Sequence, residues 1–234
     1  MKALQITAYG APLTYHEVPR PAVAGRQVLV RVTHCGMCHS DVHLHSGNFV
    51  IGDGQLQSIA GNHTLPFTLG HEIEGVVEEI GPDAELPPGV PLGTRCGVYP
   101  WIGCGHCPAC LRGEEQLCDT PAALGVQKAG GYAEFVLVPE GRYLIPAEGL
   151  APGHAGMLMC SGLTAYAALQ RMRLAGSMEP WLLIGAGGLG LSAILLARAM
   201  DLAAPYVADP RRGRPRGRDG GGGRRPPSLR RRTR

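Results

Sequence analysis

The chain has 234 residues, a formal net charge of +3 at pH 7, 44% hydrophobic residues and 18% charged residues. This composition is typical of a folded globular protein and excludes a wholly disordered one. The charge is split, because the last 25 residues hold eleven arginines and one aspartate and sum to +10, whereas the first 209 residues sum to −7. The N-terminus lacks the apolar segment of a secretory signal, so the eight cysteines point to metal binding or catalysis in a cytoplasmic protein.

The N-terminal part, residues 1–152, is predicted to form a mostly β domain of irregular barrel type. Runs of β-branched and aliphatic residues occur at 28–32, 75–80 and 135–138, and Gly- and Pro-rich turn signals separate them. The Ala-, Leu- and Met-rich stretch 155–175 predicts a helix with arginines near its end.

The following part, residues 153–209, is predicted to begin a dinucleotide-binding domain. Its pattern indicates a buried strand at 181–184, a helix at 189–200 and a second strand at 206–208, which together make one βαβ unit. The overall fold class is therefore mixed α/β. In the tail 210–234, Arg, Gly and Pro make up 21 of 25 residues, and such a segment is predicted to be disordered.

Four closely spaced cysteines form the strongest local motif, Cys104-x2-Cys107-x2-Cys110-x7-Cys118. Four thiolates at this spacing can surround one zinc ion in a closed, structural site. An iron–sulfur cluster is the alternative, but the fourth cysteine is seven residues away and no proline follows it, which disfavours the ferredoxin pattern.

A second set of metal-binding residue types is dispersed along the chain. It comprises the segment 35–43, which reads Cys-Gly-Met-Cys-His-Ser-Asp-Val-His, then Gly70-His71-Glu72, then Cys160. A single cysteine such as Cys160 is usually a small core residue. A single histidine is usually one whose ring is satisfied by hydrogen bonds. Taken together, two cysteines and one histidine supply the three protein ligands of a catalytic zinc.

A glycine-rich turn follows the predicted strand at 181–184. It contains Gly185, Gly187, Gly188 and Gly190, and Asp209 follows nineteen residues later at the end of the next strand. In this strand–turn–helix context the pattern predicts a dinucleotide site, with the pyrophosphate at the helix N-terminus. The alternative is a glycine turn that merely packs the helix on the strand.

In this order, the motifs resemble those of the zinc-dependent, medium-chain alcohol dehydrogenases from Met1 to about Asp209. The resemblance implies a GroES-like β domain with the catalytic zinc, followed by the start of a Rossmann domain for NAD(P). It also implies that an alcohol is oxidised to an aldehyde or ketone, or the reverse, by hydride transfer to the cofactor. The motifs that carry it are Cys38-His39-Ser40-Asp41, Gly70-His71-Glu72, the four-cysteine lobe, Cys160-Ser-Gly-Leu-Thr164 and the glycine turn.

The resemblance assigns a role to each matching residue of the metal site. It implies that Cys38, His71 and Cys160 are the catalytic zinc ligands. Glu72 is the carboxylate beside the metal that ligates it transiently, and Asp41 orients the ligand histidine. The zinc acts as a Lewis acid on the alcohol.

The proton relay and the cofactor site are assigned in the same way. Ser40 takes the proton of the alcohol and His43 passes it towards solvent. His39 lies by the cofactor phosphates, and Thr164 touches the nicotinamide. Asp209 accepts a hydrogen bond from the ribose 2′-hydroxyl, which favours NAD over NADP.

The tail departs from the family, whose members continue for more than a hundred residues beyond this point. One hypothesis is that residues 210–234 are an out-of-frame translation product, which leaves a truncated and inactive zinc-binding remnant. The other is that the arginine-rich tail binds nucleic acid, so that the chain is a basic-tailed zinc module. The tail has no aromatic residue for base stacking, which disfavours the second hypothesis.

The expected partners follow from the same observations. A small alcohol, aldehyde or ketone is the expected substrate. The resemblance implies a homo-oligomer, although the contacts that join the family's subunits use a part of the Rossmann sheet beyond this βαβ unit. The 18 uncharged residues between Glu179 and Arg198 contain four glycines, so they are interpreted as strand, turn and helix and not as a membrane span.

Overall fold

The computed structural model describes residues 1–61, 63–176 and 180–209. The disorder predicted for the tail 210–234 lies outside these residues. The chain divides into two compact units, Met1–Cys160 and a second that begins at Ser161. None of the helices in the described residues has the length and apolar character needed to span a membrane.

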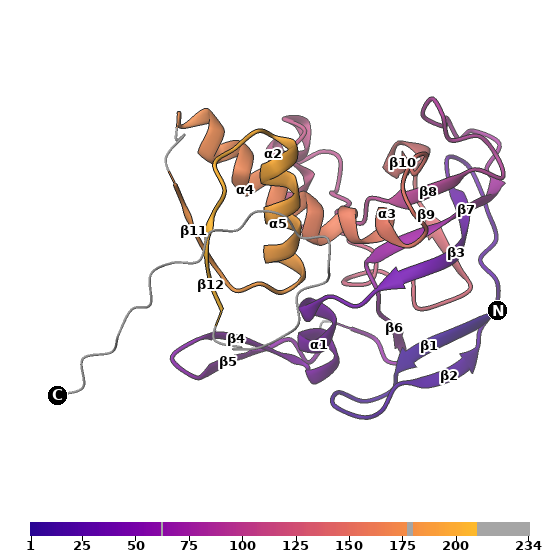
Figure 1. Ribbon diagram of the computed structural model, residues 1–234. Coiled ribbons are helices and arrows are strands. Elements are labelled where there is room, and N and C mark those ends of the chain that lie inside the picture. Colours follow the sequence, from indigo (N-terminus) through magenta and orange to yellow (C-terminus); the bar gives the residue numbers. More distant parts are fainter. Residues whose placement is uncertain (62, 177–179, 210–234) are drawn as a thin grey trace. The chain divides into compact units, whose positions relative to one another are not determined.

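The first unit is built mainly from antiparallel strands (Figure 1). Its strands are β1 (Lys2–Ile6), β2 (Thr14–Glu17), β3 (Val28–Gly36), β4 (Asn48–Gly52), β5 (Gln55–Ser58), β6 (Phe67–Thr68), β7 (Glu72–Ile80), β8 (Arg95–Val98), β9 (Phe135–Val138) and β10 (Leu144–Pro146). They form a five-stranded sheet in the order β10-β8-β7-β3-β9, a three-stranded sheet β2-β1-β6 and the hairpin β4-β5. The mostly β domain and the mixed α/β class predicted from the sequence are confirmed.

Short helices connect these strands. They are α1 (His39–Ser46), α2 (Pro108–Leu111), α3 (His154–Met157) and the 3-10 turns η1 (Glu115–Leu117) and η2 (Gly141–Tyr143). Helix α3 packs on β3, β7 and β8 (Figure 1). Aliphatic side chains of the five-stranded sheet, such as Val28, Val30 and Ile73, form the larger core, and Ile6, Leu44 and their neighbours form a second one.

Close packing of β3 on β7 depends on a glycine. A Cβ atom built on Gly75 would lie 2.4 Å from the carbonyl oxygen of Arg31, so no larger residue fits without moving the backbone. Strand β3 ends at Gly36 and strand β7 begins at Glu72, and these two residues pair with each other. The ends of β3 and β7 that lead to Cys38 and His71 are therefore neighbours.

The second unit contains α4 (Leu163–Leu174), β11 (Leu182–Ile184), α5 (Gly188–Ala199) and β12 (Tyr206–Ala208). Strands β11 and β12 pair in parallel, and α4 packs on α5. The predicted βαβ unit is present at these positions. Its apolar side chains are only partly covered, and Leu182 and Ile184 are 58% and 78% exposed.

The helix predicted at 155–175 is wrong in one respect, because the structure divides it. Helix α3 is followed by a π-helical turn, η3 (Leu158–Gly162), before α4 begins. The Ala- and Leu-rich composition suits helix throughout, but it carries no information about the wider turn. Cys160 lies in this turn.

Candidate functional site

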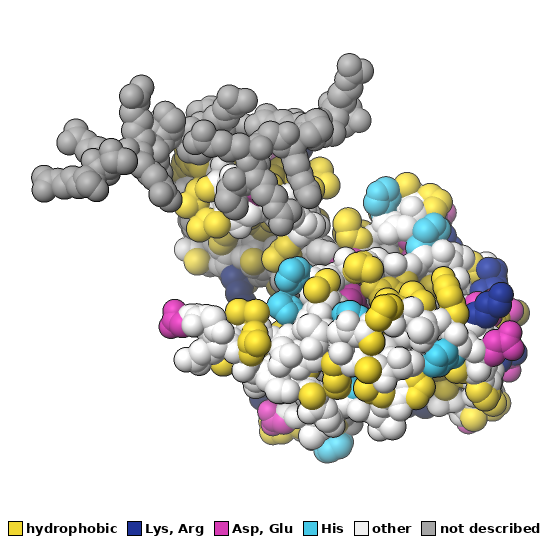
Figure 2. All heavy atoms as spheres, turned by 90° about the horizontal axis from the view of Figure 1, so that it is seen from below, with side chains coloured by type: hydrophobic (Ala, Val, Ile, Leu, Met, Phe, Trp, Pro, Cys, Tyr) yellow, Lys and Arg dark blue, Asp and Glu magenta, His cyan; other side chains and the backbone are white. Residues whose placement is uncertain are grey.

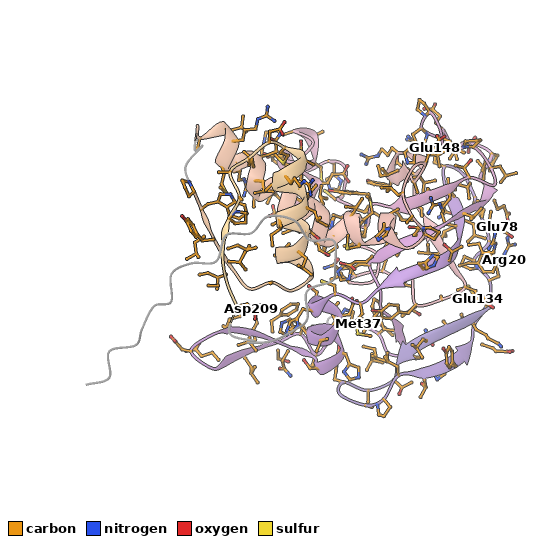
Figure 3. All side chains as sticks on the ribbon, in the orientation of Figure 1. Arg20, Met37, Glu78, Glu134, Glu148 and Asp209 are labelled. Carbon is orange, nitrogen blue, oxygen red and sulfur yellow. The ribbon has the colours of Figure 1, made fainter. Side chains whose placement is uncertain are left out.

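Three segments of the first unit bring two thiols and an imidazole together. Cys38 caps the N-terminus of α1, His71 directly precedes β7 and Cys160 lies in the π-helical turn. One ligand atom from each lies within 4.8 Å of the other two. The Sγ atoms of Cys38 and Cys160 are 3.8 Å apart, and His71 is fully buried. We call these residues the three-donor site. Met37, the residue before Cys38, lies beside α1 (Figure 3).

Asp41 orients two of the three donors. Its buried carboxylate accepts hydrogen bonds from the backbone N–H of Cys38 at 2.9 Å and of Gly70 at 3.2 Å. It also accepts one from Nδ1 of His71 at 3.2 Å. Nε2, the other ring nitrogen of His71, is buried without a hydrogen-bond partner among the described residues. A polar atom buried in this way costs free energy unless a ligand binds it.

The charges in the three-donor site favour a bound cation. The neighbouring Cys160 thiol and the His71 imidazole lower the pKa of Cys38 to about 3. Burial lowers the pKa of His71, but Asp41 and the Cys38 thiolate outweigh it and raise this pKa to about 9. The adjacent Cys38 thiolate and burial raise the pKa of Cys160. A divalent cation bound to the Cys38 thiolate can displace the protons that His71 and Cys160 hold at neutral pH.

The donor set and its spacing fit zinc. Zinc prefers thiolate and imidazole ligands, and three protein ligands leave a fourth tetrahedral position for another group. Two sulfur atoms that each lie about 2.3 Å from a tetrahedral zinc ion are about 3.8 Å apart. The Sγ atoms of Cys38 and Cys160 are separated by this distance.

The four cysteines of the lobe also converge. One sulfur from each of Cys104, Cys107, Cys110 and Cys118 lies within 4.8 Å of the others, and two of the sulfur pairs are 3.9 Å apart. Backbone N–H groups point at the sulfurs, as from Cys107 to Cys104 at 3.3 Å and from Cys104 to Cys118 at 3.3 Å. Such contacts lower the pKa of Cys104 to about 6 and lower that of Cys118. Four thiolate donors fit a closed zinc site.

Glu115 fastens this lobe to the rest of the unit. Its carboxylate accepts hydrogen bonds from the backbone N–H of Gly103 at 2.9 Å and from the Tyr143 hydroxyl at 2.7 Å, and it forms an ion pair with Arg142. These contacts keep it ionised, because they outweigh burial and lower its pKa.

We expect Glu115→Ala to lower the free energy of unfolding by about 1–3 kcal/mol, because it leaves the Gly103 N–H and the Tyr143 hydroxyl without their acceptor. Urea denaturation of the metal-loaded chain measures this change. Glu114→Ala is the matched control, because Glu114 pairs with Arg112 at the surface, where both side chains are exposed. An equal loss in both variants would contradict the anchoring role.

The other residues predicted for the catalytic domain lie in α1 and at the start of β7. Ser40 is in α1, with its Oγ 3.8 Å from the Cys38 sulfur. His39 is exposed, and its ring centre is 4.7 Å from that of His43. Several histidine side chains reach the face drawn in Figure 2. Glu72 is buried with its carboxylate against Gly36, but among the described residues the group of mutually close ligand atoms does not include it.

The glycine turn lies between β11 and α5 in the second unit. Gly185 has a φ of 89°, and a Cβ atom on Gly190 would lie 2.1 Å from the Gly185 carbonyl oxygen, so both positions need glycine. Gly187 is the N-cap residue of α5, Gly188 is its first residue, and both are exposed.

Asp209 is brought to the glycine turn by the pairing of β12 with β11. Its Oδ2 accepts a hydrogen bond from the backbone N–H of Ala186 at 2.7 Å. The position of Asp209 at the end of β12 is visible in Figure 3. Thr164 is an exposed residue of α4.

Sequence reasoning missed the role of Glu74. This residue is fully buried in β7, and its carboxylate accepts hydrogen bonds from the N–H groups of Gly153 and Ala155, where α3 begins. It also pairs with Arg95 at 3.1 Å. The sequence feature that could have revealed this role is a carboxylate among the apolar residues of β7, because a buried charge needs partners.

Comparison with known proteins identifies the family of the chain. Residues 24–149 match the family model of the alcohol dehydrogenase GroES-like domain. The chain is 40% identical over 212 residues to an NAD-dependent alcohol dehydrogenase of Sulfurisphaera tokodaii, and the match covers 90% of this chain and 59% of that protein. An NAD-dependent alcohol dehydrogenase of Saccharolobus solfataricus is 39% identical with the same coverage.

Solved structures show the same likeness. The alcohol dehydrogenase of Aeropyrum pernix matches with a TM-score of 0.72 and 30% identity, over 88% of this chain and 58% of that one. Acetophenone reductase from Geotrichum candidum, solved in complex with NAD, matches with a TM-score of 0.71 and 29% identity, over 89% and 57%. The chain thus spans about three fifths of the length of the relatives it matches. With its family resemblance confirmed by these matches, the chain belongs to the zinc-type, medium-chain alcohol dehydrogenase family with an N-terminal GroES-like domain.

Proposed function

We propose that this chain is a zinc- and NAD-dependent alcohol dehydrogenase that interconverts an alcohol and an aldehyde or ketone. The observation that carries the proposal is the buried Nε2 atom of His71, which lacks a hydrogen-bond partner among the described residues and lies beside the Cys38 and Cys160 thiols. The relatives named NAD-dependent alcohol dehydrogenases support the choice of reaction. In this proposal the four-cysteine lobe holds a second, structural zinc ion.

The residues around the three-donor site have separate tasks in this reaction. A zinc ion bound there supplies Lewis acidity towards the alcohol oxygen, and NAD supplies the hydride acceptor. Asp41 holds Nδ1 of His71 protonated, so that Nε2 is the donor atom. Ser40, whose hydroxyl lies beside Cys38, accepts the proton of the alcohol, and His43 passes it on towards solvent.

The second unit contributes part of the cofactor site in this proposal. The N-terminus of α5 and the turn Gly185–Gly188 bind the pyrophosphate through backbone N–H groups. Asp209, held beside this turn by Ala186, accepts a hydrogen bond from the adenosine ribose, which favours NAD over NADP. His39 binds a cofactor phosphate, and Thr164 contacts the nicotinamide.

The proposal predicts two zinc ions per chain and NADH formation from an alcohol. The purified chain is given NAD and a panel of primary and secondary alcohols, while metal content is measured by elemental analysis and NADH by its absorbance. The expected result is two zinc ions and turnover of at least one alcohol. Two zinc ions without turnover would support the inactive remnant instead, and no zinc in the three-donor site would contradict the proposal.

A further inference from the structure

Tyr132 touches the segments that carry two of the three donors. Its hydroxyl donates a hydrogen bond to the carbonyl oxygen of Gly36 at 3.3 Å, two residues before Cys38. Its ring packs on Gly70, the residue before His71, so closely that a Cβ atom built on Gly70 would lie 2.5 Å from a ring carbon. One side chain therefore contacts both the end of β3 and the turn before β7.

The backbone of Tyr132 is fixed from two directions. Its N–H donates to the Leu69 carbonyl oxygen at 3.0 Å, and its own carbonyl accepts from the N–H of Leu4 at 2.7 Å. The preceding loop also presses on Gly70, because a Cβ atom on Gly130 would lie 2.2 Å from the Gly70 carbonyl oxygen. The half-buried ring consequently has little freedom to move away from Gly70.

We propose that Tyr132 is a positioning residue of the metal centre, which sets the separation of Cys38 from His71 by bonding to Gly36 and packing on Gly70. The inference rests on the proposed function, because it requires the three-donor site to bind zinc. Asp41 joins the same two segments through its carboxylate, which accepts from the N–H groups of Cys38 and Gly70, whereas Tyr132 contacts the Gly36 carbonyl oxygen and the Cα side of Gly70. Loss of the tyrosine hydroxyl therefore loosens the ligands without removing one.

The test compares the unaltered chain with Tyr132→Phe and Tyr15→Phe, each freed of metal and reloaded with Co²⁺. Tyr132→Phe keeps the ring on Gly70 and removes only the hydroxyl, and Tyr15 is a 76% exposed residue of β2 that serves as the control. Co²⁺ bound by two thiolates and one imidazole absorbs differently from Co²⁺ bound by four thiolates, so one spectrum reports both sites. Competition with a chelator then gives the Zn²⁺ affinity of each.

For Tyr132→Phe we expect Zn²⁺ affinity at the three-donor site to fall about tenfold, with altered Co²⁺ bands, because partners behind metal ligands have effects of this size. The four-cysteine site and the Tyr15→Phe chain should stay within about twofold of the unaltered protein. If Tyr132→Phe leaves the Zn²⁺ affinity and the Co²⁺ bands of the three-donor site unchanged, the inference about Tyr132 is wrong but the proposed function stands. This holds even if the free energy of unfolding of the variant is lower. Absence of metal at the three-donor site of the unaltered chain would overturn the proposed function together with the inference.

Discussion

A chain with Cys160 replaced by alanine is expected to bind one zinc ion where the unaltered chain binds two, and to form no NADH from any alcohol. Only Cys38 and His71 remain as donors in the three-donor site, and catalytic zinc needs three protein ligands. The four-cysteine lobe is untouched and keeps its ion. Elemental analysis after dialysis against a weak chelator, together with NADH absorbance, measures both effects.

Cys96→Ala is the matched control for this variant. Cys96 is also a buried thiol, but it lies in the core of the five-stranded sheet. Burial and the nearby Glu74 raise its pKa to about 12, and among the described residues its sulfur belongs to neither group of mutually close ligand atoms. This control should retain two zinc ions. Two zinc ions in Cys160→Ala would show that the assigned ligand is wrong.

Replacing Glu74 with alanine is expected to lower the free energy of unfolding by about 3 kcal/mol, the lower end of the cost of removing one partner from a buried ion pair, because Arg95 is 30% exposed. The Arg95 guanidinium would lose its carboxylate, and the N–H groups of Gly153 and Ala155 would lose their acceptor. The start of α3, which leads to Cys160, would be released at the same time. Urea denaturation measures the change.

The control is Glu78→Ala in the same strand. Glu78 pairs with Arg31 at 3.1 Å, but the two side chains are 34% and 46% exposed, and Figure 3 shows Glu78 at the periphery. Exposed pairs of this kind contribute about 0–1 kcal/mol. Equal destabilisation by the two substitutions would mean that Glu74 has no special role in anchoring α3.

The same carboxylate predicts how stability depends on pH. Burial raises the pKa of Glu74, but the N–H groups of Gly153 and Ala155 and the charge of Arg95 outweigh it and hold the pKa below the usual 4.5. A carboxylate whose pKa is lowered by folding stabilises the folded state at any pH above its unfolded-state pKa. This stability is lost as the pH falls from the unfolded-state pKa through the folded-state pKa. Glu74→Gln should therefore lose less stability than the unaltered chain when the pH falls below about 4.5.

Local patterns were sufficient to predict much of the fold. The strand at 135–138 and the strand at 206–208 have the predicted limits, because alternation and short apolar runs depend only on neighbouring residues. The helix over 155–175 was wrong at its centre, since the π-helical turn at Leu158–Gly162 has no composition of its own. Helix α1 was not predicted, because its residues His39–Ser46 are mostly polar and show no apolar periodicity.

One of the two candidate metal sites could be predicted from local spacing, and the other could not. Close spacing of Cys104, Cys107, Cys110 and Cys118 predicts a metal lobe by itself, because all four donors lie in one short segment, 104–118. Cys38 and Cys160 are 122 residues apart, and no local pattern connects them. Their residue types made them candidate ligands, and only the resemblance to a family assigned them to the same metal site before the structure did.

Sequence alone predicted the kind of chemistry that we propose, namely thiolate and imidazole donors for zinc and a glycine turn for a dinucleotide, because residue type and short spacing define those groups. The pairing of β3 with β7 decided how Cys38 meets His71, and the anchoring of α3 by Glu74 decided where Cys160 lies. The contacts of Tyr132 with Gly36 and Gly70 arose in the same way. These are contacts between distant segments, and packing in three dimensions sets them, since no residue's local preference specifies which remote backbone it will touch.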